Sequence, residues 1–352
     1  GYGKQQNEAK LWDQYWPSAD SPMPDPQWPK GAQAKRGTNG YLYSKPIAVG
    51  KSTEGRPPHF FDWAPDSQSE SGTADHKVVD WAAGELRKPH KHPFFHAVGI
   101  FRPHIPWYAP KKYFALYPKK NVFLPKIKEN DLEDVPKHGQ YGIRKQWHEW
   151  ILKNDEWRDA VRGYLASISF ADAQVGRLLD ALDAGPHSKK TIIVLWSDHG
   201  MHIGEKQQWE KFTLFEESTR VPLMIVAPGI TKAGTVCDQP VNLLDVYPTL
   251  NELCDLPKRN DLDGVSLVPL LKNPKAKWDR PSITTWGKGN HAAWSQRYRY
   301  IRHPNGDEQL YDHQTDPDEF TNLADKPELS GVKERLAKWL PKTNANPVRN
   351  KK

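Results

Sequence analysis

Cysteine and long apolar segments are both scarce in this chain of 352 residues. The two cysteines, Cys237 and Cys254, belong to no Cys-x-x-Cys pair, which excludes a structural zinc site and a thioredoxin-type motif. They could form one disulfide or be two separate buried apolar side chains, and the sequence leaves both open. Every apolar run is far shorter than the ~20 residues that a transmembrane helix needs, so we predict no membrane span.

Several common functional signatures are absent as well. The sequence contains no Gly-x-Ser-x-Gly elbow, Walker loop, dinucleotide fingerprint or His-Glu-x-x-His motif. Their absence argues against the commonest hydrolases, kinases, dehydrogenases and metalloproteases. The sequence also lacks a zinc finger, a helix-turn-helix pattern and a basic stripe interleaved with aromatic residues, so we predict no nucleic-acid partner.

Aromatic residues and positive charge, by contrast, are plentiful. The 15 Trp, 13 Tyr and 11 Phe residues supply large rigid surfaces for a folded core or a binding cleft. Lys and Arg number 50 against 43 Asp and Glu, which gives a net charge of +7. This excess suits an anionic partner such as a sulfated or phosphorylated substrate, although a mildly basic surface without a function explains it equally well.

The N-terminal third shows little periodicity. Roughly the first 75 residues are rich in Pro, Trp and Gly, which predicts irregular structure. Residues 75–86 place apolar side chains on one side of a short predicted helix. Residues 93–101 form a continuous apolar run that ends in the proline-rich segment 102–106. A short apolar run closed by proline predicts a buried strand that leads into a loop.

The middle of the chain predicts an α/β fold. Residues 157–182 carry apolar side chains at helical spacing, and Gly185-Pro186 ends this predicted helix. The runs 191–196 and 221–227 predict buried strands, and residues 241–253 predict a helix. A long helix followed by a buried strand is typical of β-α-β units, so we expect a mostly parallel central sheet flanked by helices.

The pattern changes beyond about residue 275, which predicts a second subdomain. Short strands separated by turns are expected at 282–286, 298–302 and 309–311, and an amphipathic helix at 332–340. We therefore expect a larger domain over residues 1–275 and a small C-terminal antiparallel α+β subdomain over residues 276–352. The length accommodates this division, since a domain typically takes roughly 150 residues.

The strongest candidate for chemistry directly follows the predicted strand 191–196. In open α/β sheets, sites lie beyond the carboxyl ends of strands, and Asp198 and His199 stand there side by side. A carboxylate and an imidazole can both bind one divalent cation, and Gly200 and Gly204 allow the backbone to approach closely. The alternative is structural, with Asp198 capping a helix and His199 hydrogen-bonded within a loop.

Two further candidates are a histidine and a lysine. His104 lies between Pro103 and Pro106, and a loop fixed by prolines suits a proton donor or acceptor. Lys211 follows Trp209-Glu210 and could contact an anion. The alternatives are a hydrogen-bonded loop histidine and a solvated surface lysine.

These segments and several others coincide with the motifs of one family. The matching segments are Pro93-Phe94-Phe95, Val98-Gly99, Pro103-His104-Ile105-Pro106, residues 167–182 (SISFADAQVGRLLDAL), residues 191–204, residues 205–211, Val221-Pro222-Leu223, residues 297–301, Leu310-Tyr311-Asp312, Asp316-Pro317, Glu319 and Asn322-Leu323. In this order they resemble the sulfatases of the alkaline-phosphatase superfamily. The resemblance is strongest to the iduronate-2-sulfatase-like carbohydrate sulfatases and covers nearly the whole chain from about Trp12 to Leu340.

The resemblance implies an alkaline-phosphatase-like fold and a set of roles for the candidate residues. Asp198 and His199 would be two ligands of a calcium ion, Lys211 would contact the sulfate group, and His104 would act as the proton donor near the leaving oxygen. Calcium and a lysine would neutralise charge on the transferring group, while the histidine would supply the proton that the alkoxide needs.

The resemblance also implies a substrate and a location. Arg102, His202 and Trp209 would contact a sulfated carbohydrate. Arg102 stands where relatives often carry Lys, and its charge beside His104 could select an acidic sugar. Family members that act on polymers are exported, so a secreted or periplasmic protein is expected.

One departure from the family is large. Sulfatases use a formylglycine made from Cys or Ser in a C/S-x-P-x-R motif, and neither Cys237 nor Cys254 is followed by Pro-x-Arg. The N-terminal strand with its paired acidic metal ligands is also missing from this sequence. We therefore expect a companion N-terminal segment of the same precursor to supply the formylglycine. The alternatives are a phosphoester or phosphonate hydrolase of the same superfamily, and a non-catalytic sugar-binding relative.

Overall fold

The structure is a computed structural model that describes residues 12–16, 61–66 and 69–346. Most of the predicted irregular N-terminal region lies outside the described residues. The described residues fall into two compact units, one within Gly1–Leu124 and Glu149–Lys190 and the other within Pro125–His148 and Thr191–Lys352. The boundary predicted between residues 275 and 276 stays a prediction.

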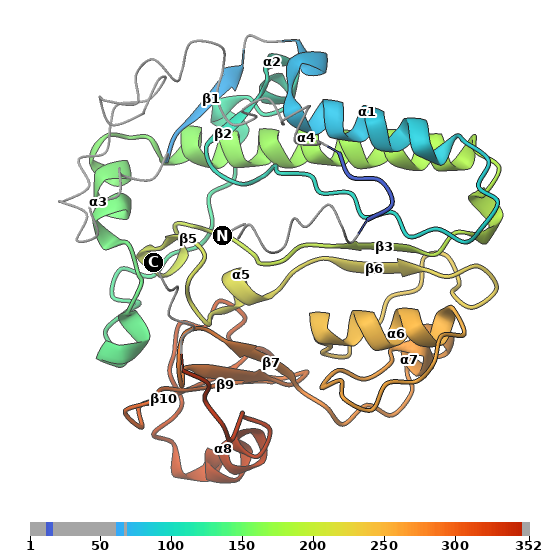
Figure 1. Cartoon of the computed structure of the whole chain (residues 1–352). Helices are drawn as coiled ribbons and strands as arrows, with labels where there is room; N and C mark the ends of the chain where they lie inside the picture. Colours follow the sequence, from blue (N-terminus) through green and yellow to red (C-terminus); the bar gives the residue numbers. More distant parts are fainter. Residues whose placement is uncertain (1–11, 17–60, 67–68, 347–352) are drawn as a thin grey trace. The chain divides into compact units, whose positions relative to one another are not determined.

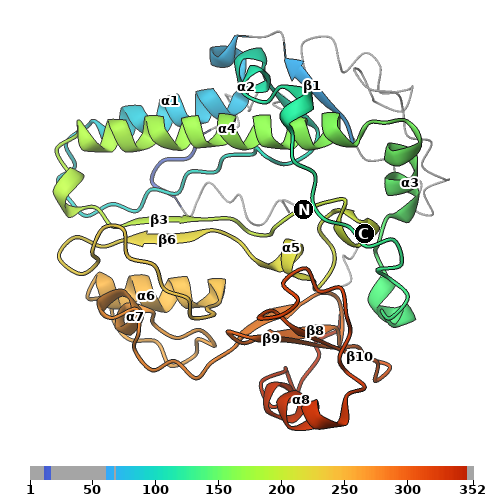
Figure 2. The same ribbon diagram turned by 180° about the vertical axis from the view of Figure 1, so that it is seen from behind.

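Two long helices form the frame of the first unit. Helices α1 (Ala74–Leu86) and α4 (Trp157–Asp183) pack side by side, as Figures 1 and 2 show from opposite sides. Both helix predictions are confirmed. The parallel pair β1 (Trp63–Asp66) and β2 (Trp107–Pro110) packs on α4, and α2 (Lys111–Ala115) follows β2 directly.

The prediction of a strand at residues 93–101 is wrong. These residues form no helix and pair with no strand among the described residues, and their exposure alternates along the run. Phe95 is 71% exposed, with its ring 5.9 Å from that of Trp12. The strand forms instead at β2, where the fully buried Trp107 pairs with Trp63. Apolar composition alone does not make a strand, because the backbone also needs a hydrogen-bonding neighbour.

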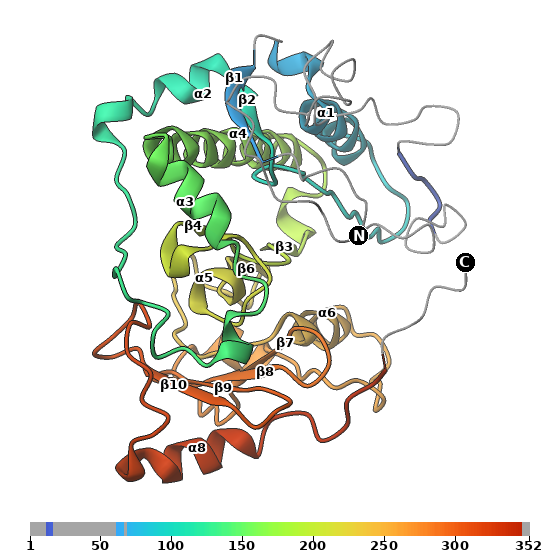
Figure 3. The ribbon, with the colours of Figure 1, turned by 90° about the vertical axis from the view of Figure 1, so that its left-hand side faces the viewer.

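The second unit contains the small antiparallel sheet that the sequence predicts. Strands β7 (Ser282–Thr285), β8 (His291–Trp294), β9 (Tyr298–Arg302) and β10 (Glu308–Asp312) pair in the order β10-β9-β8-β7. Helix α8 (Ser330–Ala337) packs against β8 and β9, as Figure 3 shows. The three predicted strands and the final helix are confirmed, and β8 is the one strand of this sheet that the sequence pattern missed.

The predicted strands at 191–196 and 221–227 also form, but they pair differently from the expectation. Strands β3 (Ile193–Trp196) and β6 (Leu223–Val226) are antiparallel, with Ile193 opposite Val226. The chain turns back between them through β4 (His202–Ile203), β5 (Trp209–Glu210) and α5 (Glu216–Thr219).

Helices and strands are therefore mixed as expected of an α/β protein. Among residues 12–16, 61–66 and 69–346, however, β1–β2 is the one parallel pair, and the mostly parallel central sheet is not seen. The predicted helix at 241–253 appears as α6 (Val246–Leu253) after a 3-10 turn, and α7 (Val268–Lys272) follows. Cys237 and Cys254 are exposed free thiols, so no disulfide joins them.

The remaining elements are short. The boundary between the two units falls within helix α3 (Lys145–Lys153). The 3-10 turns lie at Glu70–Gly72, Lys119–Asn121, Lys137–Gln140, Ser188–Lys190, Glu205–Gln207, Leu243–Asp245 and Pro327–Leu329.

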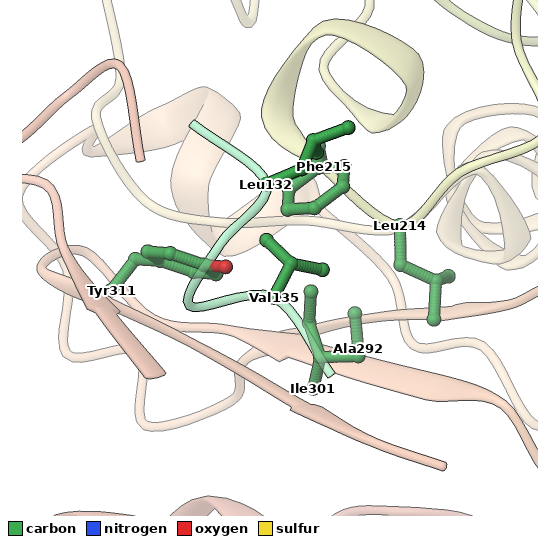
Figure 4. Packing of buried hydrophobic residues seen from close by; sticks show 7 residues of the cluster. All are labelled: Leu132, Val135, Leu214, Phe215, Ala292, Ile301 and Tyr311. Carbon is green, nitrogen blue, oxygen red and sulfur yellow. The ribbon is translucent and has the colours of Figure 1, made fainter. Parts of the chain in front are cut away.

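A compact apolar cluster joins three parts of the second unit. Its buried members are Leu132, Val135, Leu214, Phe215, Ala292, Ile301 and Tyr311 (Figure 4). They come from the segment before α3, from the residues that lead into α5, and from strands β8, β9 and β10. The chain between Lys211 and α5 is therefore fixed against the sheet by burial of apolar surface.

Substitutions at two glycines of α4 can test how closely β1 packs on this helix. A Cβ at Gly163 would lie 2.6 Å from Cβ of Trp63, whereas a Cβ at Gly176 would meet nothing within 4 Å. Gly176→Ala should raise the free energy of unfolding by about 0.5–1 kcal/mol, because alanine favours a helix interior. Gly163→Ala should lower it by about 1–3 kcal/mol through overpacking. Urea unfolding measures both, and equal effects would contradict the packing described.

Candidate functional site

Asp198 and His199 lie directly after β3 with their side chains facing each other. His199 Nε2 is 3.8 Å from Asp198 Oδ1. His199 Nδ1 lies 2.7 Å from the carbonyl oxygen of Gly200 and donates to it, which leaves the lone pair on Nε2. The Asp198 side chain is 74% exposed and that of His199 30%. A backbone hydrogen bond of this kind is the usual way to orient a metal-binding imidazole.

These two side chains fit part of a cation site. The exposed carboxylate and the Nε2 lone pair are an oxygen and a nitrogen donor on one side of the loop. Calcium takes six to eight oxygen ligands, so two donors would have to be joined by others. No group of three or more His, Cys, Asp or Glu side chains that could hold a metal occurs in the part of the chain that the structure describes.

Backbone contact fixes the loop that carries this pair. The N–H of Gly200 donates to the carbonyl oxygen of Ser218 at 2.9 Å. A Cβ at Gly200 would lie 1.9 Å from the carbonyl oxygen of Glu217, so only glycine fits there. The loop after β3 is thus held against helix α5.

Lys211 shares the electrostatic environment of Asp198. Burial lowers the pKa of Lys211 below its ordinary value, the carboxylates of Glu210 and Asp198 oppose that shift, and the Arg144 guanidinium adds to it. The ammonium also lies 5.3 Å from the centre of the Phe212 ring. A partly desolvated lysine is suited to hold an anion, because burial strengthens electrostatic attraction.

The segment around Lys211 is strained. Lys206, Gln207, Glu210 and Phe212 have φ angles of 54°, 53°, 85° and 77°, in the left-handed region that non-glycine residues rarely adopt. Each such residue costs on the order of 1–3 kcal/mol and persists only where the surroundings enforce it, which happens most often at functional sites.

Polar contacts within the second unit enforce this backbone. Arg144 Nε donates to Glu210 Oε2 at 2.6 Å, and the Glu210 side chain is 3% exposed. Gln208 Nε2 donates to the carbonyl oxygen of Lys211 at 2.7 Å, while Gln208 Oε1 accepts from the N–H of Arg144. Sequence reasoning missed Arg144 and Gln208. Arg144 lies outside every motif, and Gln208 differs in no visible way from a surface glutamine.

His202 and Trp209, the predicted substrate contacts of this unit, are both fully buried. His202 Nε2 lies 2.8 Å from Thr213 Oγ1, and Trp209 Nε1 donates to His148 Nδ1 at 3.3 Å. Both rings lie beneath the surface and support the segment that carries Lys211. Their contact with a substrate stays a prediction.

Arg102 and His104 lie in the first unit. Arg102 is 7% exposed, and its guanidinium donates to the carbonyl oxygens of Tyr108 at 2.8 Å and His104 at 3.3 Å. It therefore shapes the proline-rich loop, and its selection of an acidic sugar stays a prediction. His104 Nδ1 donates to the carbonyl oxygen of Ile105 at 2.5 Å, so Nε2 is the ring nitrogen that can accept or release a proton.

The sequence matches two family models over most of its length. Residues 11–256 match the sulfatase family, and residues 204–346 match the family described as N-sulphoglucosamine sulphohydrolase, C-terminal. The chain belongs to the sulfatase family. The expectation from the motifs is confirmed at this level, and the site described above lies within the matched residues.

Individual sulfatases support the assignment. A sulfatase of Formosa agariphila is 40% identical over 290 residues, which cover 81% of this chain and 56% of the relative. Human iduronate 2-sulfatase is 35% identical over 200 residues, which cover 53% of this chain and 36% of that enzyme. This sulfatase chain spans about half the length of the curated relatives it matches.

Solved structures show the fold. A phosphonate monoester hydrolase from Silicibacter pomeroyi superposes with a TM-score of 0.69 at 20% identity, covering 87% of this chain and 67% of that one. At this identity the likeness supports an α/β fold of the sulfatase and alkaline-phosphatase type and carries no information on the reaction.

His202 provides a pH test of the buried layer beneath the site. Burial lowers the pKa of His202 to about 3, so between pH 6.5 and 3 only the unfolded chain binds a proton there. The stability due to the neutral ring is complete above pH 6.5 and is lost as the pH falls, by up to about 1.4 kcal/mol per pH unit. Between pH 7 and pH 5, the wild type should lose about 2 kcal/mol more unfolding free energy than His202→Gln. Equal losses in urea titrations would contradict this burial.

Proposed function

We propose that this chain is the larger part of the catalytic domain of a sulfatase that removes sulfate from a sulfated carbohydrate. The observation that carries the proposal is the exposed Asp198–His199 pair, which shares its electrostatic environment with the desolvated Lys211. A cation site near a partly desolvated ammonium suits an anionic ester such as a sulfate, because both positive groups attract the oxygens of the same anion.

The chain's own residues would bind and orient the sulfate. Asp198 and His199 would hold a calcium ion, which when bound would neutralise charge on the sulfate oxygens. Lys211 would donate to the sulfate from a position that the strained backbone fixes. A formylglycine from a companion segment outside this chain would supply the attacking oxygen. Loss of the lysine would leave the negative charge of the transferring group uncompensated.

His104 would serve as the proton donor to the leaving sugar oxygen. Its Nδ1–H is held by the carbonyl oxygen of Ile105, so the proton would move to or from Nε2. A rigid proline-rich loop keeps the imidazole from adopting alternative rotamers, which favours proton transfer at one defined atom.

Three features support a carbohydrate as the substrate. The C-terminal residues match a family described as an N-sulphoglucosamine sulphohydrolase, and one relative is named iduronate 2-sulfatase. The net charge of +7 favours an anionic polymer. Export to the periplasm or the medium would give access to such a polymer. No helix in the described ranges is both long and apolar enough to cross a membrane.

A phosphonate or phosphoester hydrolase is the second candidate, because the fold is shared with a phosphonate monoester hydrolase. A non-catalytic sugar-binding relative is the third. Assaying the natural gene product on a chromogenic sulfate ester and on the matching phosphate and phosphonate esters separates the three. Sulfate release supports the proposal, phosphorus-ester hydrolysis alone supports the second candidate, and no turnover supports the third.

Lys211→Ala should lower kcat for a chromogenic sulfate ester by roughly 100–1,000-fold, since it removes a positive group from the transferring sulfate. The fold should remain intact, as shown by an unchanged far-UV circular dichroism spectrum. Lys232→Ala removes an exposed lysine of the same unit and should leave kcat within about twofold. Near-normal sulfate release by Lys211→Ala would refute the role of Lys211.

Chelation should inactivate the enzyme reversibly. Treatment with EDTA should abolish sulfate release, and added calcium should restore it. Calcium at about 100 times its Kd should also stabilise the folded protein by about 2.7 kcal/mol, visible as a higher Tm. In Asp198→Asn, both the recovery of activity and the rise in Tm should need a higher calcium concentration than in the wild type. An EDTA-treated protein that keeps full activity would contradict the metal requirement.

A further inference from the structure

Glu319 belongs to a C-terminal motif to which no function has been assigned above. It lies after β10 in the sequence Asp316-Pro317-Asp318-Glu319 and is 1% exposed. Its φ of 55° is in the left-handed region, and Asp316 shapes the turn by accepting from the N–H of Phe320 at 3.0 Å. A charged residue buried in a strained backbone conformation must be enforced by its surroundings.

The carboxylate of Glu319 is engaged through both oxygens. Oε1 accepts from Arg299 Nε at 2.5 Å and from His313 Nε2 at 2.8 Å, and Oε2 accepts from the N–H of Glu216 at 3.0 Å. Burial alone would raise the pKa of Glu319, but Arg299 and His313 outweigh it and hold the pKa at about 2. The group is therefore an anion at every working pH, bound to strand β9 and to the start of α5.

One connection runs from Glu319 to the segment of Lys211. The ammonium of Lys206 donates to the carbonyl oxygen of Glu319 and, at 2.8 Å, to Asp131 Oδ1. Lys206 is 1% exposed, and the rings of Phe215, Phe320 and Tyr311 surround its ammonium, with centres 5.1, 5.5 and 5.6 Å away. The positive-φ segment that leads to Lys211 begins at this anchored residue.

A second connection runs from Glu319 to the Asp198–His199 loop. The N–H of Glu216 donates a hydrogen bond to the Glu319 carboxylate, and Glu216 is the first residue of helix α5. Two residues later, the carbonyl oxygen of Ser218 accepts from the N–H of Gly200, next to His199. Arg299 supports the same helix by donating to Thr219 Oγ1 at 2.9 Å.

We propose that Glu319 is a positioning residue for the candidate site, and that its carboxylate and carbonyl tie the two loops bearing Lys211 and Asp198–His199 to the C-terminal sheet. This inference rests on the proposed function. Because a misplacement of about 1 Å can lower a rate about 100-fold, loosening either loop costs turnover before it costs folding. The C-terminal sheet then contributes to the reaction without touching the substrate.

Glu319→Gln tests the proposal in the natural gene product. The amide still accepts from Arg299 and His313 through one oxygen, but its NH₂ group faces the N–H of Glu216, so two donors oppose each other. With a chromogenic sulfate ester, kcat should fall about tenfold while KM changes less than about twofold, because transition-state contacts are lost and ground-state binding is kept.

Glu308→Gln is the matched control. Glu308 is a partly buried carboxylate of the same sheet that pairs with Lys333 at 2.7 Å and contacts neither loop. It should leave kcat within twofold, even where it lowers Tm as much as Glu319→Gln does. Losses of kcat that follow Tm equally in both variants would show a merely structural role and overturn the proposal.

Hydrogen–deuterium exchange provides a readout that needs no turnover. In Glu319→Gln, amides of residues 214–220 and 198–200 should exchange faster than in the wild type, with β7–β10 protected as before. The double variant Lys206→Met/Asp131→Asn removes the buried pair together and should speed exchange at residues 205–212 instead. If Glu319→Gln does not fold, the double variant serves as the test in its place.

Unchanged exchange in both loops would overturn the proposal. Wild-type protein that hydrolyses no sulfate ester would refute the proposed function alone, because the exchange result still decides whether Glu319 positions the loops.

Discussion

Buried ion pairs hold the loops of the second unit. Lys206 and Asp131 are 1% and 2% exposed and bond to each other at 2.8 Å, and the Arg299–Glu319 pair is as deeply buried. Removing one partner of such a pair costs about 3–5 kcal/mol, because the other charge is left without solvent. This constraint keeps strained backbone in place between Lys206 and Phe212, which a loosely packed loop could not do.

The supporting ion pairs are buried, whereas Asp198, His199 and Lys211 are at least partly exposed. Lys206, Asp131, Arg299 and Glu319 form ion pairs beneath the surface, whereas the Asp198 carboxylate is 74% exposed. Lys211 lies between these two environments, partly desolvated and near Asp198. A rigid base that carries an exposed carboxylate, a neighbouring imidazole and a partly desolvated lysine is suited to bind a cation and an anion together. In the first unit, Arg102 donates to two backbone carbonyl oxygens and fixes the loop that carries His104.

The helices, strands and site residues that depend on a local sequence pattern could be predicted from the sequence. Helix α4 and strand β9 carry strong periodicity and appeared as predicted. Strand β8 was missed because two of its four residues are alanine, which does not favour strands. The run at 93–101 was misread because pairing depends on a neighbouring strand. The motifs identified Asp198, His199 and Lys211, but the roles of Arg144 and Glu319 depend on contacts between distant residues, which no local pattern encodes.

The central claim is that Asp198 and His199 bind a divalent cation at a sulfate-binding site. The most direct test is a crystal structure of the natural gene product grown with calcium and sulfate, with anomalous scattering used to locate the cation. We expect a cation bonded to Asp198 Oδ1 and His199 Nε2 within about 2.6 Å, with Lys211 contacting the sulfate. A cation bound elsewhere, with these two side chains turned away from it, would show that Asp198 and His199 do not form the cation site.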